Sequence, residues 1–209
     1  MAPLLKKYVS GEQTKYKLNL DFEVTQGQIA RSNLIASELT LYKEWQLSVD
    51  LKLDRNTINN WSNVLALQDE SAGQYGDRIP AVFMHARSNT LHICNSVNNN
   101  WNHCHNTGYV GTNWFNLRIG QREEDAGYRY EIYINGDLEY SVLNSSPEVF
   151  SNVRVELANQ SFQEASKGSF RNFQISTNRP EPVQPTEPPQ PVILPGNIQY
   201  GEFEILKIS

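Results

Sequence analysis

Residues 128–142 read YRYEIYINGDLEYSV, two stretches of alternating apolar and polar residues joined by the pair Asn135-Gly136. A two-residue turn of type I′ needs positive φ at both central positions, and asparagine and glycine tolerate this best. Alternation with a period of two is typical of half-buried strands. This stretch therefore predicts an antiparallel hairpin and makes an all-β fold the first expectation.

The same alternation extends outward from the hairpin through residues 18–176. Its clearest examples are WQLSVDLKL (45–53), WFNLRIGQ (114–121) and SNVRVELA (151–158), and short turn signals separate them. No segment of ten or more residues carries an apolar stripe with helical spacing. About a dozen short strands in such an order predict two packed antiparallel sheets.

Charge and hydropathy argue against a nucleic-acid partner and against a segment that spans a membrane. The net charge is -5, the sequence pI is near 5.4, and no cluster of five or more Lys and Arg residues occurs, so we expect no nucleic-acid partner. No apolar stretch approaches the about 18 to 20 residues that span a bilayer. Residues 1–11 lack the apolar centre of a signal peptide, which does not by itself assign the chain to the cytosol.

The composition changes abruptly near residue 178. The segment RPEPVQPTEPPQPVILP holds seven of the chain's ten prolines, which favours an extended spacer. We therefore expect a β-sandwich over 1–177, a proline-rich linker over 178–196 and an extra strand over 197–209. That strand either adds to an edge of the sandwich or begins a further module.

The chain's two cysteines, Cys94 and Cys104, flank an asparagine-rich turn in LHICNSVNNNWNHCH (91–105). A turn centred near Asn99 would place them opposite each other in an antiparallel pair, where a cross-strand disulfide can form. A disulfide favours an oxidising, extracellular compartment. Three N-x-[ST] sequons point the same way and make three asparagines candidates for N-glycosylation: Asn60, Asn144 and Asn159.

The order of these elements resembles the concanavalin A-like lectin and glucanase superfamily, which includes laminin-G-like, pentraxin and galectin domains. The resemblance rests on the succession of DFEV (21–24), KEWQLSVDLKL (43–53), NVLALQD (63–69), GDRIPAVFMH (76–85), WFNLRIGQ (114–121), the Asn135-Gly136 hairpin and GSFRNFQIS (168–176). It implies a jelly-roll sandwich that binds glycans or matrix proteins on a sheet face or at the loop ends.

All four histidines fall within 21 residues that also contain both cysteines. If Cys94 opposes Cys104, alternation is expected to send Asn95, Trp101, His103 and His105 to one face, and His85 and Arg87 share a face of the preceding segment. Tryptophan stacks on sugar rings, and His, Arg and Asn hydrogen-bond to hydroxyls. The candidate ligand-binding residues are His85, Arg87, Asn95, Trp101, Asn102, His103 and His105.

This patch loosely resembles a galectin site, although its spacing departs from that pattern. The competing interpretation is that the histidines are exposed polar hairpin residues and that Trp101 packs on the rim.

Two metal sites are alternatives. His103 and His105 could bind zinc together with His92 or with free thiolates, but a disulfide removes those thiolates. Asp69 and Asp77 border a loop that could hold calcium, whereas an Asp77-Arg78 ion pair or a turn cap would serve only to fix that loop. We expect no required cofactor.

Catalytic signatures are absent from the sequence. Retaining glucanases of this superfamily carry their paired carboxylates at alternate positions of one strand, and no such strand occurs here. We therefore predict a non-enzymatic, extracellular, lectin-like domain that binds glycans or glycoproteins and has the potential to form homo-oligomers through exposed sheet edges. The alternatives are a structural or adhesive matrix module that binds proteins and a glycosidase whose carboxylates converge from different strands.

Overall fold

A computed structural model describes residues 6–10, 13–18, 22–24, 33–57, 59–71, 73–158 and 164–179, with side-chain surroundings from residue 34 onward. Most of the predicted linker and the whole of the predicted strand at 197–209 lie outside these ranges. Every regular element in the described chain is a strand. The described residues include no helix long and apolar enough to cross a membrane.

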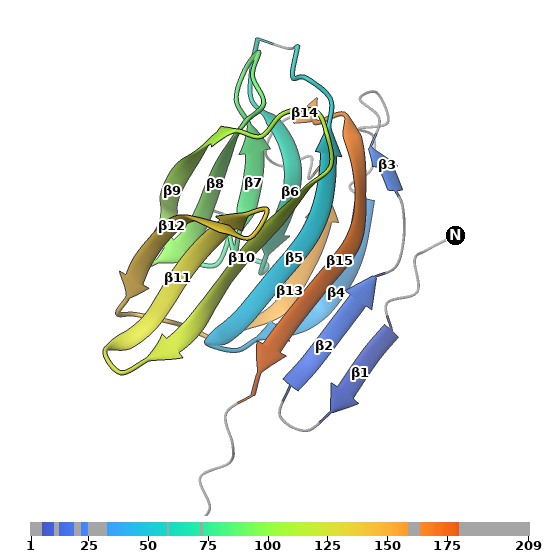
Figure 1. The fold of residues 1–209 in the computed structure, drawn as a ribbon. Coiled ribbons are helices and arrows are strands. Elements are labelled where there is room, and N and C mark those ends of the chain that lie inside the picture. The colour runs from blue at the N-terminus through green and yellow to red at the C-terminus, as the bar shows by residue number, and fades with distance from the viewer. Residues whose placement is uncertain are drawn as a thin grey trace, which may run out of the picture.

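The first sheet has eight strands, and seven of them follow the order β1-β2-β15-β5-β10-β11-β12 while β3 pairs with β15 (Figure 1). All of its pairings are antiparallel. Its members are β1 (Lys6–Ser10), β2 (Gln13–Leu18), β3 (Phe22–Val24), β5 (Glu44–Leu53), β10 (Phe115–Glu124), β11 (Gly127–Ile134), β12 (Asp137–Asn144) and β15 (Gly168–Asn178).

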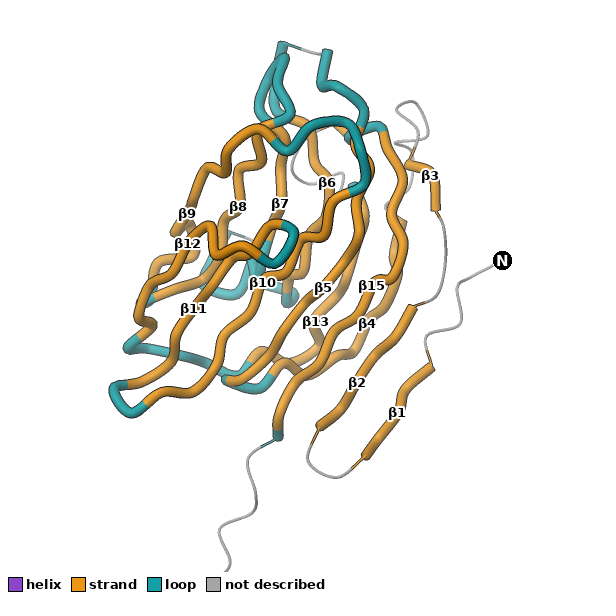
Figure 2. The backbone as a smooth tube through the Cα atoms, viewed as in Figure 1, coloured by secondary structure: helices purple, strands orange, loops and turns teal. Residues whose placement is uncertain are grey.

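The second sheet lies behind the first, as the backbone tube in Figure 2 makes clear. Its order is β4-β13-β6-β7-β8-β9, with the short β14 parallel to β6 and all other pairs antiparallel. Its members are β4 (Asn33–Leu41), β6 (Ser62–Gln68), β7 (Ala81–Met84), β8 (Thr90–Val97), β9 (Asn100–Tyr109), β13 (Phe150–Leu157) and β14 (Glu164–Ala165). The two sheets confirm the predicted antiparallel jelly-roll sandwich.

The core between the sheets follows from the alternation in the sequence. In β5 the buried positions are Trp45, Leu47, Val49, Leu51 and Leu53, and the residues between them face outward. The inward residues of both sheets form one apolar cluster. Burying each large apolar side chain contributes roughly 1.5–3 kcal/mol, so this cluster drives the sheets together.

The hairpin between β11 and β12 has the predicted turn. Asn135 and Gly136 have φ values of 53° and 90°, as a type I′ turn requires. The Asn135 side chain has a further role, because its Oδ1 accepts a hydrogen bond from the backbone N–H of Asn116 at 2.9 Å. The turn is thereby fixed to the start of β10.

Candidate functional site

An open groove of about 250 Å³ lies on the outer face of the first sheet. It crosses four neighbouring strands, β15, β5, β10 and β11. Its lining residues are Glu44, Trp45, Gln46, Arg118, Gly120, Gln121, Arg122, Glu131, Tyr133, Ser176, Thr177 and Asn178. None of these residues was among the ligand-binding candidates from the sequence.

Gly120 lies at the centre of the groove. It pairs with Gln46 of β5 on one side and with Glu131 of β11 on the other. A Cβ atom at this position would stand 2.8 Å from the carbonyl oxygen of Trp45 and 3.3 Å from Cα of Gln46. Glycine therefore permits the close approach of β5 and leaves the space between Gln46 and Glu131 unfilled.

Arg118 and Tyr133 form the aromatic wall of the groove. They are cross-strand partners on β10 and β11, and Cζ of Arg118 lies 3.8 Å from the centroid of the Tyr133 ring. This contact is a cation–π interaction over the face of the ring. Among the described residues Arg118 forms no ion pair with a carboxylate, so its N–H groups remain available to a ligand.

A charged network borders the groove next to Gly120. Arg122 contacts Glu131 at 3.1 Å and Glu124 at 2.8 Å, and Arg129 contacts Glu124 at 2.9 Å. Burial raises the pKa of the Glu131 carboxyl. Hydrogen bonds from Arg122 and Tyr133 and the charges of nearby arginines lower that pKa by more than burial raises it, so the net shift is downward. Glu131 is therefore a carboxylate at neutral pH, able to accept hydrogen bonds.

The opposite end of the groove is lined by Glu44 and Asn178. Nδ2 of Asn178 donates a hydrogen bond to Oε2 of Glu44. Thr177 secures the backbone there, since its hydroxyl donates to the carbonyl of Glu44 at 3.1 Å and accepts from the N–H of Tyr42 at 2.8 Å. This end presents a carboxylate and an amide side by side.

The ligand-binding residues predicted from the β8–β9 hairpin do not form one patch. The disulfide register is as expected, with Cys94 opposite Cys104 and Asn95 opposite His103, but the register shifts between Asn95 and Val97. This irregularity in β9 changes the side of the sheet to which Trp101 points. The single face expected for the tryptophan and the two histidines is therefore wrong.

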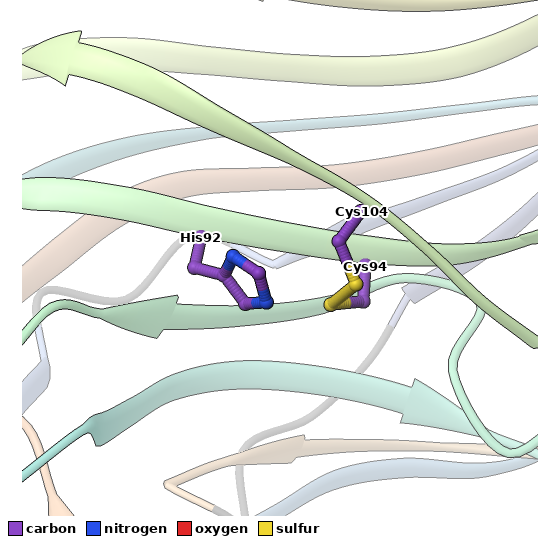
Figure 3. Close-up of side chains that lie close together, drawn as sticks. All are labelled: His92, Cys94 and Cys104. Carbon is purple, nitrogen blue, oxygen red and sulfur yellow. A yellow bond between two sulfur atoms is a disulfide. The ribbon is translucent and has the colours of Figure 1, made fainter.

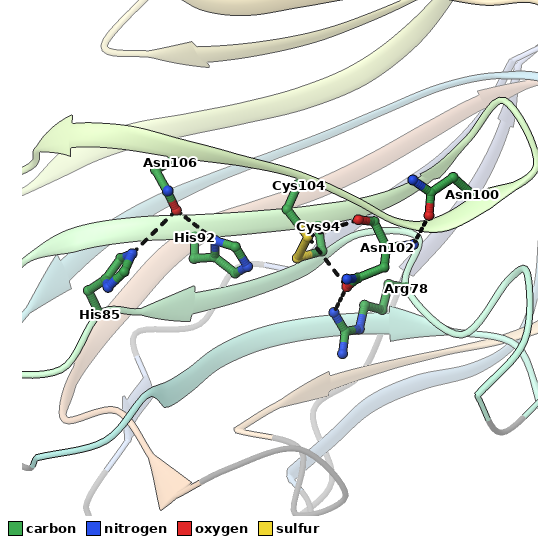
Figure 4. The surroundings of a disulfide bond; sticks show 8 residues. All are labelled: Arg78, His85, His92, Cys94, Asn100, Asn102, Cys104 and Asn106. Carbon is green, nitrogen blue, oxygen red and sulfur yellow. Dashed lines mark hydrogen bonds between the residues drawn. A yellow bond between two sulfur atoms is a disulfide. The ribbon is translucent and has the colours of Figure 1, made fainter.

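Trp101 and Asn102 lie with Arg78 on the outer face of the second sheet. Cζ of Arg78 is 4.8 Å from the Trp101 ring and 5.6 Å from the ring of Phe83, and its Nη1 donates to Oδ1 of Asn102. Figure 4 shows Arg78 and Asn102 beside the disulfide. Phe83 belongs to the apolar cluster on this outer face.

His103 and His105 lie on the inner face, where the edge strand β9 approaches β12 of the other sheet. Nε2 of His103 is 2.9 Å from the hydroxyl of Tyr140, and His105 stacks on the Tyr140 ring with centroids 4.5 Å apart. Burial lowers the pKa of His103. Asn95 shares this inner face and is buried. The two half-buried histidines therefore connect β9 to β12 of the other sheet.

His85 and Arg87 are also separated from each other. His85 packs on Trp61 with ring centroids 4.0 Å apart and contacts Oδ1 of Asn106 at 3.3 Å, on the outer face. Arg87 has a φ of 54° and is exposed in the turn between β7 and β8. The expected shared face fails because the strand ends at Met84.

The predicted disulfide is present. Cys94 and Cys104 are bonded with an S–S distance of 2.12 Å, and His92 lies beside them on the same outer face (Figure 3). In the part of the chain that the structure describes, His92, Cys94 and Cys104 are the one group of three potential ligands close enough to hold a single metal ion. The expected zinc arrangement with His103 and His105 is wrong, because those histidines point to the inner face.

The predicted calcium loop connects β6 and β7. Oδ1 of Asp69 accepts hydrogen bonds from the N–H and the hydroxyl of Ser71, and the N–H of Asp69 donates to the carbonyl of Gly76 at 3.0 Å. The N–H of Asp77 donates to the carbonyl of Gln74 at 3.1 Å. These contacts fix the loop, and calcium binding by Asp69 and Asp77 stays a prediction.

The three sequons differ in accessibility. Asn60 is exposed, next to Trp61. Asn144 is only 1% exposed, and its Nδ2 donates to Oε1 of Gln121 at 2.7 Å, so the folded protein does not offer it for glycosylation. Asn159 lies outside the described residues. The expectation of a glycan at Asn144 is therefore corrected.

Comparison with known proteins finds no matching family model and no matching curated protein. Among solved structures, a heptameric pentraxin from Limulus polyphemus is 12% identical, with 68% of this chain and 67% of that chain covered and a TM-score of 0.48. The sialyllactose-bound CBM40 of a Ruminococcus gnavus sialidase is 11% identical, with 76% and 91% covered and a TM-score of 0.48.

The binding domain of botulinum neurotoxin DC, in complex with SialylT, is 15% identical, with 83% of this chain covered and a TM-score of 0.45. This chain spans only 39% of that toxin structure. The jelly-roll architecture of this chain follows from its own strand order.

Proposed function

We propose that this chain is a non-enzymatic carbohydrate-binding domain whose ligand lies in the groove of the first sheet. The observation that carries the proposal is the arrangement around Gly120. Because this residue has no side chain, it leaves an open space in the groove, and Arg118 over the ring of Tyr133 borders that space. The groove is open and crosses four strands, so an extended oligosaccharide fits it better than a small apolar molecule does.

The groove has the chemistry that sugars require. Sugar hydroxyls donate and accept hydrogen bonds, and the groove supplies donors on Arg118 and Gln46, acceptors on Glu44 and Glu131, and an amide on Asn178. The Arg118–Tyr133 pair supplies a flat surface against which a pyranose ring can pack. Nucleic acid fits poorly, because two carboxylates line the groove and the net charge is -5.

The state of Glu131 supports binding without catalysis. A general acid in glycoside hydrolysis needs a raised pKa so that it is protonated at working pH. The pKa of Glu131 is instead shifted downward, and its carboxylate is engaged by Arg122 at 3.1 Å. Glu44 alone does not supply the acid and nucleophile pair of a retaining enzyme.

An extracellular location is part of the proposal. The Cys94–Cys104 disulfide supports it, because such bonds persist in oxidising compartments. Glycans or glycoproteins are the proposed partners. A groove of this size on one domain binds weakly, so we expect display of several copies to raise the avidity.

The test is a screen of immobilised glycans with wild type, Arg118→Ala and Tyr133→Ala. The matched control is Arg171→Ala, which also removes an arginine that lies over an aromatic ring, that of Trp114 just before β10 at 4.2 Å, but does not line the groove. We expect the two groove variants to lose the wild-type signal and the control to keep it. Running the screen with calcium and again with a chelator tests the predicted calcium dependence.

Trp101→Ala tests the alternative binding surface on the β8–β9 hairpin, where Trp101 lies beside Arg78 and Asn102. Loss of the signal in Trp101→Ala with full binding by Arg118→Ala would move the site to the hairpin and contradict the groove. No signal from wild type on any glycan would contradict carbohydrate binding altogether.

A further inference from the structure

The outer face of the second sheet gathers three groups that bind soft metal ions. His92 and Cys94 are two residues apart on β8 and therefore share a face, and the pairing with β9 places Cys104 opposite Cys94. One ligand atom from each of the three lies within 4.8 Å of the others. Figure 3 shows the imidazole of His92 directed along the strand toward the two sulfur atoms.

The hydrogen bonds of His92 determine which nitrogen faces the sulfurs. Nδ1 of His92 is 2.6 Å from Oδ1 of Asn106. Because Oδ1 is an acceptor, Nδ1 carries the proton and Nε2 keeps its lone pair. Figure 4 shows Asn106 on one side of the ring and the cysteines on the other. A histidine held at one nitrogen by an oxygen is the usual arrangement of a metal-binding imidazole.

The two sulfurs have different surroundings, because Cys94 is buried in the apolar cluster with Phe83 whereas Cys104 has polar neighbours. Sγ of Cys104 lies 3.3 Å from the carbonyl oxygen of Asn102 and 3.4 Å from its Oδ1. Asn102 in turn accepts a hydrogen bond from the guanidinium of Arg78.

We propose that, once the Cys94–Cys104 disulfide is reduced, His92, Cys94 and Cys104 bind a zinc ion. A dithiol reductant supplies two electrons and two protons and becomes a cyclic disulfide, leaving two thiols on the protein. Zinc then displaces both thiol protons and takes Sγ of each cysteine and Nε2 of His92, with water in the fourth position. Two sulfurs bound to one tetrahedral zinc stand about 3.8 Å apart, so the ion binds only after the S–S bond is broken.

The proposal is independent of the glycan groove. The groove lies on the outer face of the first sheet, whereas the cysteines lie on the outer face of the second, with the core between them. It also differs from a site built on His103 and His105, whose rings contact Tyr140 on the inner face. Disulfide and zinc-bound forms exclude each other, so zinc would hinder reoxidation of the cysteines.

The test is a titration of the full chain with cobalt(II), which reports tetrahedral thiolate ligation by its visible and charge-transfer absorption. The chain is reduced with dithiothreitol, freed of reductant by anaerobic desalting and titrated beside the oxidised chain. We expect one equivalent to bind to the reduced chain, none to the oxidised chain, and zinc to displace the cobalt.

Variants assign the ligands. We expect Cys104→Ser to abolish the charge-transfer bands and His92→Asn to weaken binding at least about 100-fold, while Asn106→Ala weakens it about 10–100-fold through loss of orientation. The matched control is His105→Asn, a histidine of the same hairpin that contacts Tyr140 on the inner face and lies outside the ligand group. Loss of binding in His103→Asn with retention in His92→Asn would overturn the assignment.

Thermal melting keeps the proposal testable if a variant folds poorly. Zinc bound to the folded, reduced chain must raise its Tm relative to the same sample with chelator. An unchanged Tm, or cobalt bands that appear only in denatured protein, would overturn the proposal. Normal glycan binding together with absent cobalt bands would reject the metal site alone.

Discussion

Asp50 connects three strands on the outer face of the first sheet. Its carboxylate accepts hydrogen bonds from Nδ2 of Asn116 at 2.9 Å and Nδ2 of Asn172 at 2.7 Å, and it lies 3.4 Å from Nε of Arg171. These partners come from β10 and β15, on either side of β5. Asn172 has a φ of 51°, in the segment where the β15–β5 register shifts, so the carboxylate stabilises an irregular part of the sheet.

Replacement of Asp50 should change how stability depends on pH. Burial raises the pKa of the Asp50 carboxyl, but hydrogen bonds from Asn116, Asn172 and Arg171 outweigh burial and lower it below its usual value. A lowered folded-state pKa means that this carboxylate stabilises the fold above the unfolded pKa and that the stabilisation is lost as pH falls through the folded pKa. We expect Asp50→Asn to be less stable than wild type at pH 7, with the difference shrinking below about pH 4.

Urea unfolding at a series of pH values measures this effect. Asp54→Asn is the control, because Asp54 is an exposed carboxylate just beyond the end of β5. A stability difference for Asp50→Asn that stays constant down to pH 2 would contradict the role assigned to the ionised carboxylate.

At the scale of strands, the alternation in the sequence predicted β5, β10, β11 and β13, the pair Asn135-Gly136 predicted the type I′ hairpin, and the turn near Asn99 predicted the disulfide register. It was insufficient near Trp101, because one irregularity in β9 changes the face of that side chain and alternation carries no sign of it. The groove could not be predicted either, since it needs the order β15-β5-β10-β11. One signal was present, because a glycine inside a strand pattern, Gly120, indicates a close backbone approach.

Because β10 approaches β5 closely at Gly120, a larger residue at this position should disturb both strands. In Gly120→Ala the new Cβ would meet the Trp45 carbonyl oxygen at 2.8 Å, a backbone atom that moves only if the sheet moves. We expect a loss of about 1–3 kcal/mol in the free energy of unfolding, together with weaker glycan binding, because the methyl group also enters the groove.

Gly108→Ala is the matched control for this change. Gly108 lies in the edge strand β9, and a Cβ added there meets no atom within 4 Å. Denaturant titration should find its stability close to that of wild type. Equal stability losses in the two variants would contradict a specific steric requirement at Gly120.

In the whole molecule, the core separates the groove from the disulfide face. The groove and the disulfide face lie on the outer sides of opposite sheets, and the apolar cluster between them is continuous. The histidine cluster that dominated the sequence is divided between two places: His85 and His92 lie with their ring centroids 6.0 Å apart on the outer face beside the disulfide, and His103 and His105 lie on the inner face near Tyr140. Proximity in the chain therefore did not produce one site, because neighbouring residues in a strand point to opposite faces.

This separation predicts that the two surfaces act independently. The double variant Cys94→Ser, Cys104→Ser lacks the disulfide, and we expect it to lose about 2–4 kcal/mol of stability. Its affinity for the glycan identified in the screen should stay within about twofold of wild type at a temperature where it is folded. Distant sites without shared contacts behave additively to within about 0.5 kcal/mol.

A double-mutant cycle measures the coupling directly. Glycan affinities of wild type, Arg118→Ala, the double cysteine variant and their combination, titrated at glycan concentrations high enough to quantify the weakened Arg118→Ala binding, give a coupling energy that should be indistinguishable from zero. Circular dichroism and intrinsic fluorescence verify that each protein is folded. If the folded double cysteine variant loses glycan binding while Arg118→Ala keeps it, the ligand lies on the disulfide face, beside Trp101 and Arg78, and the groove is not the binding site.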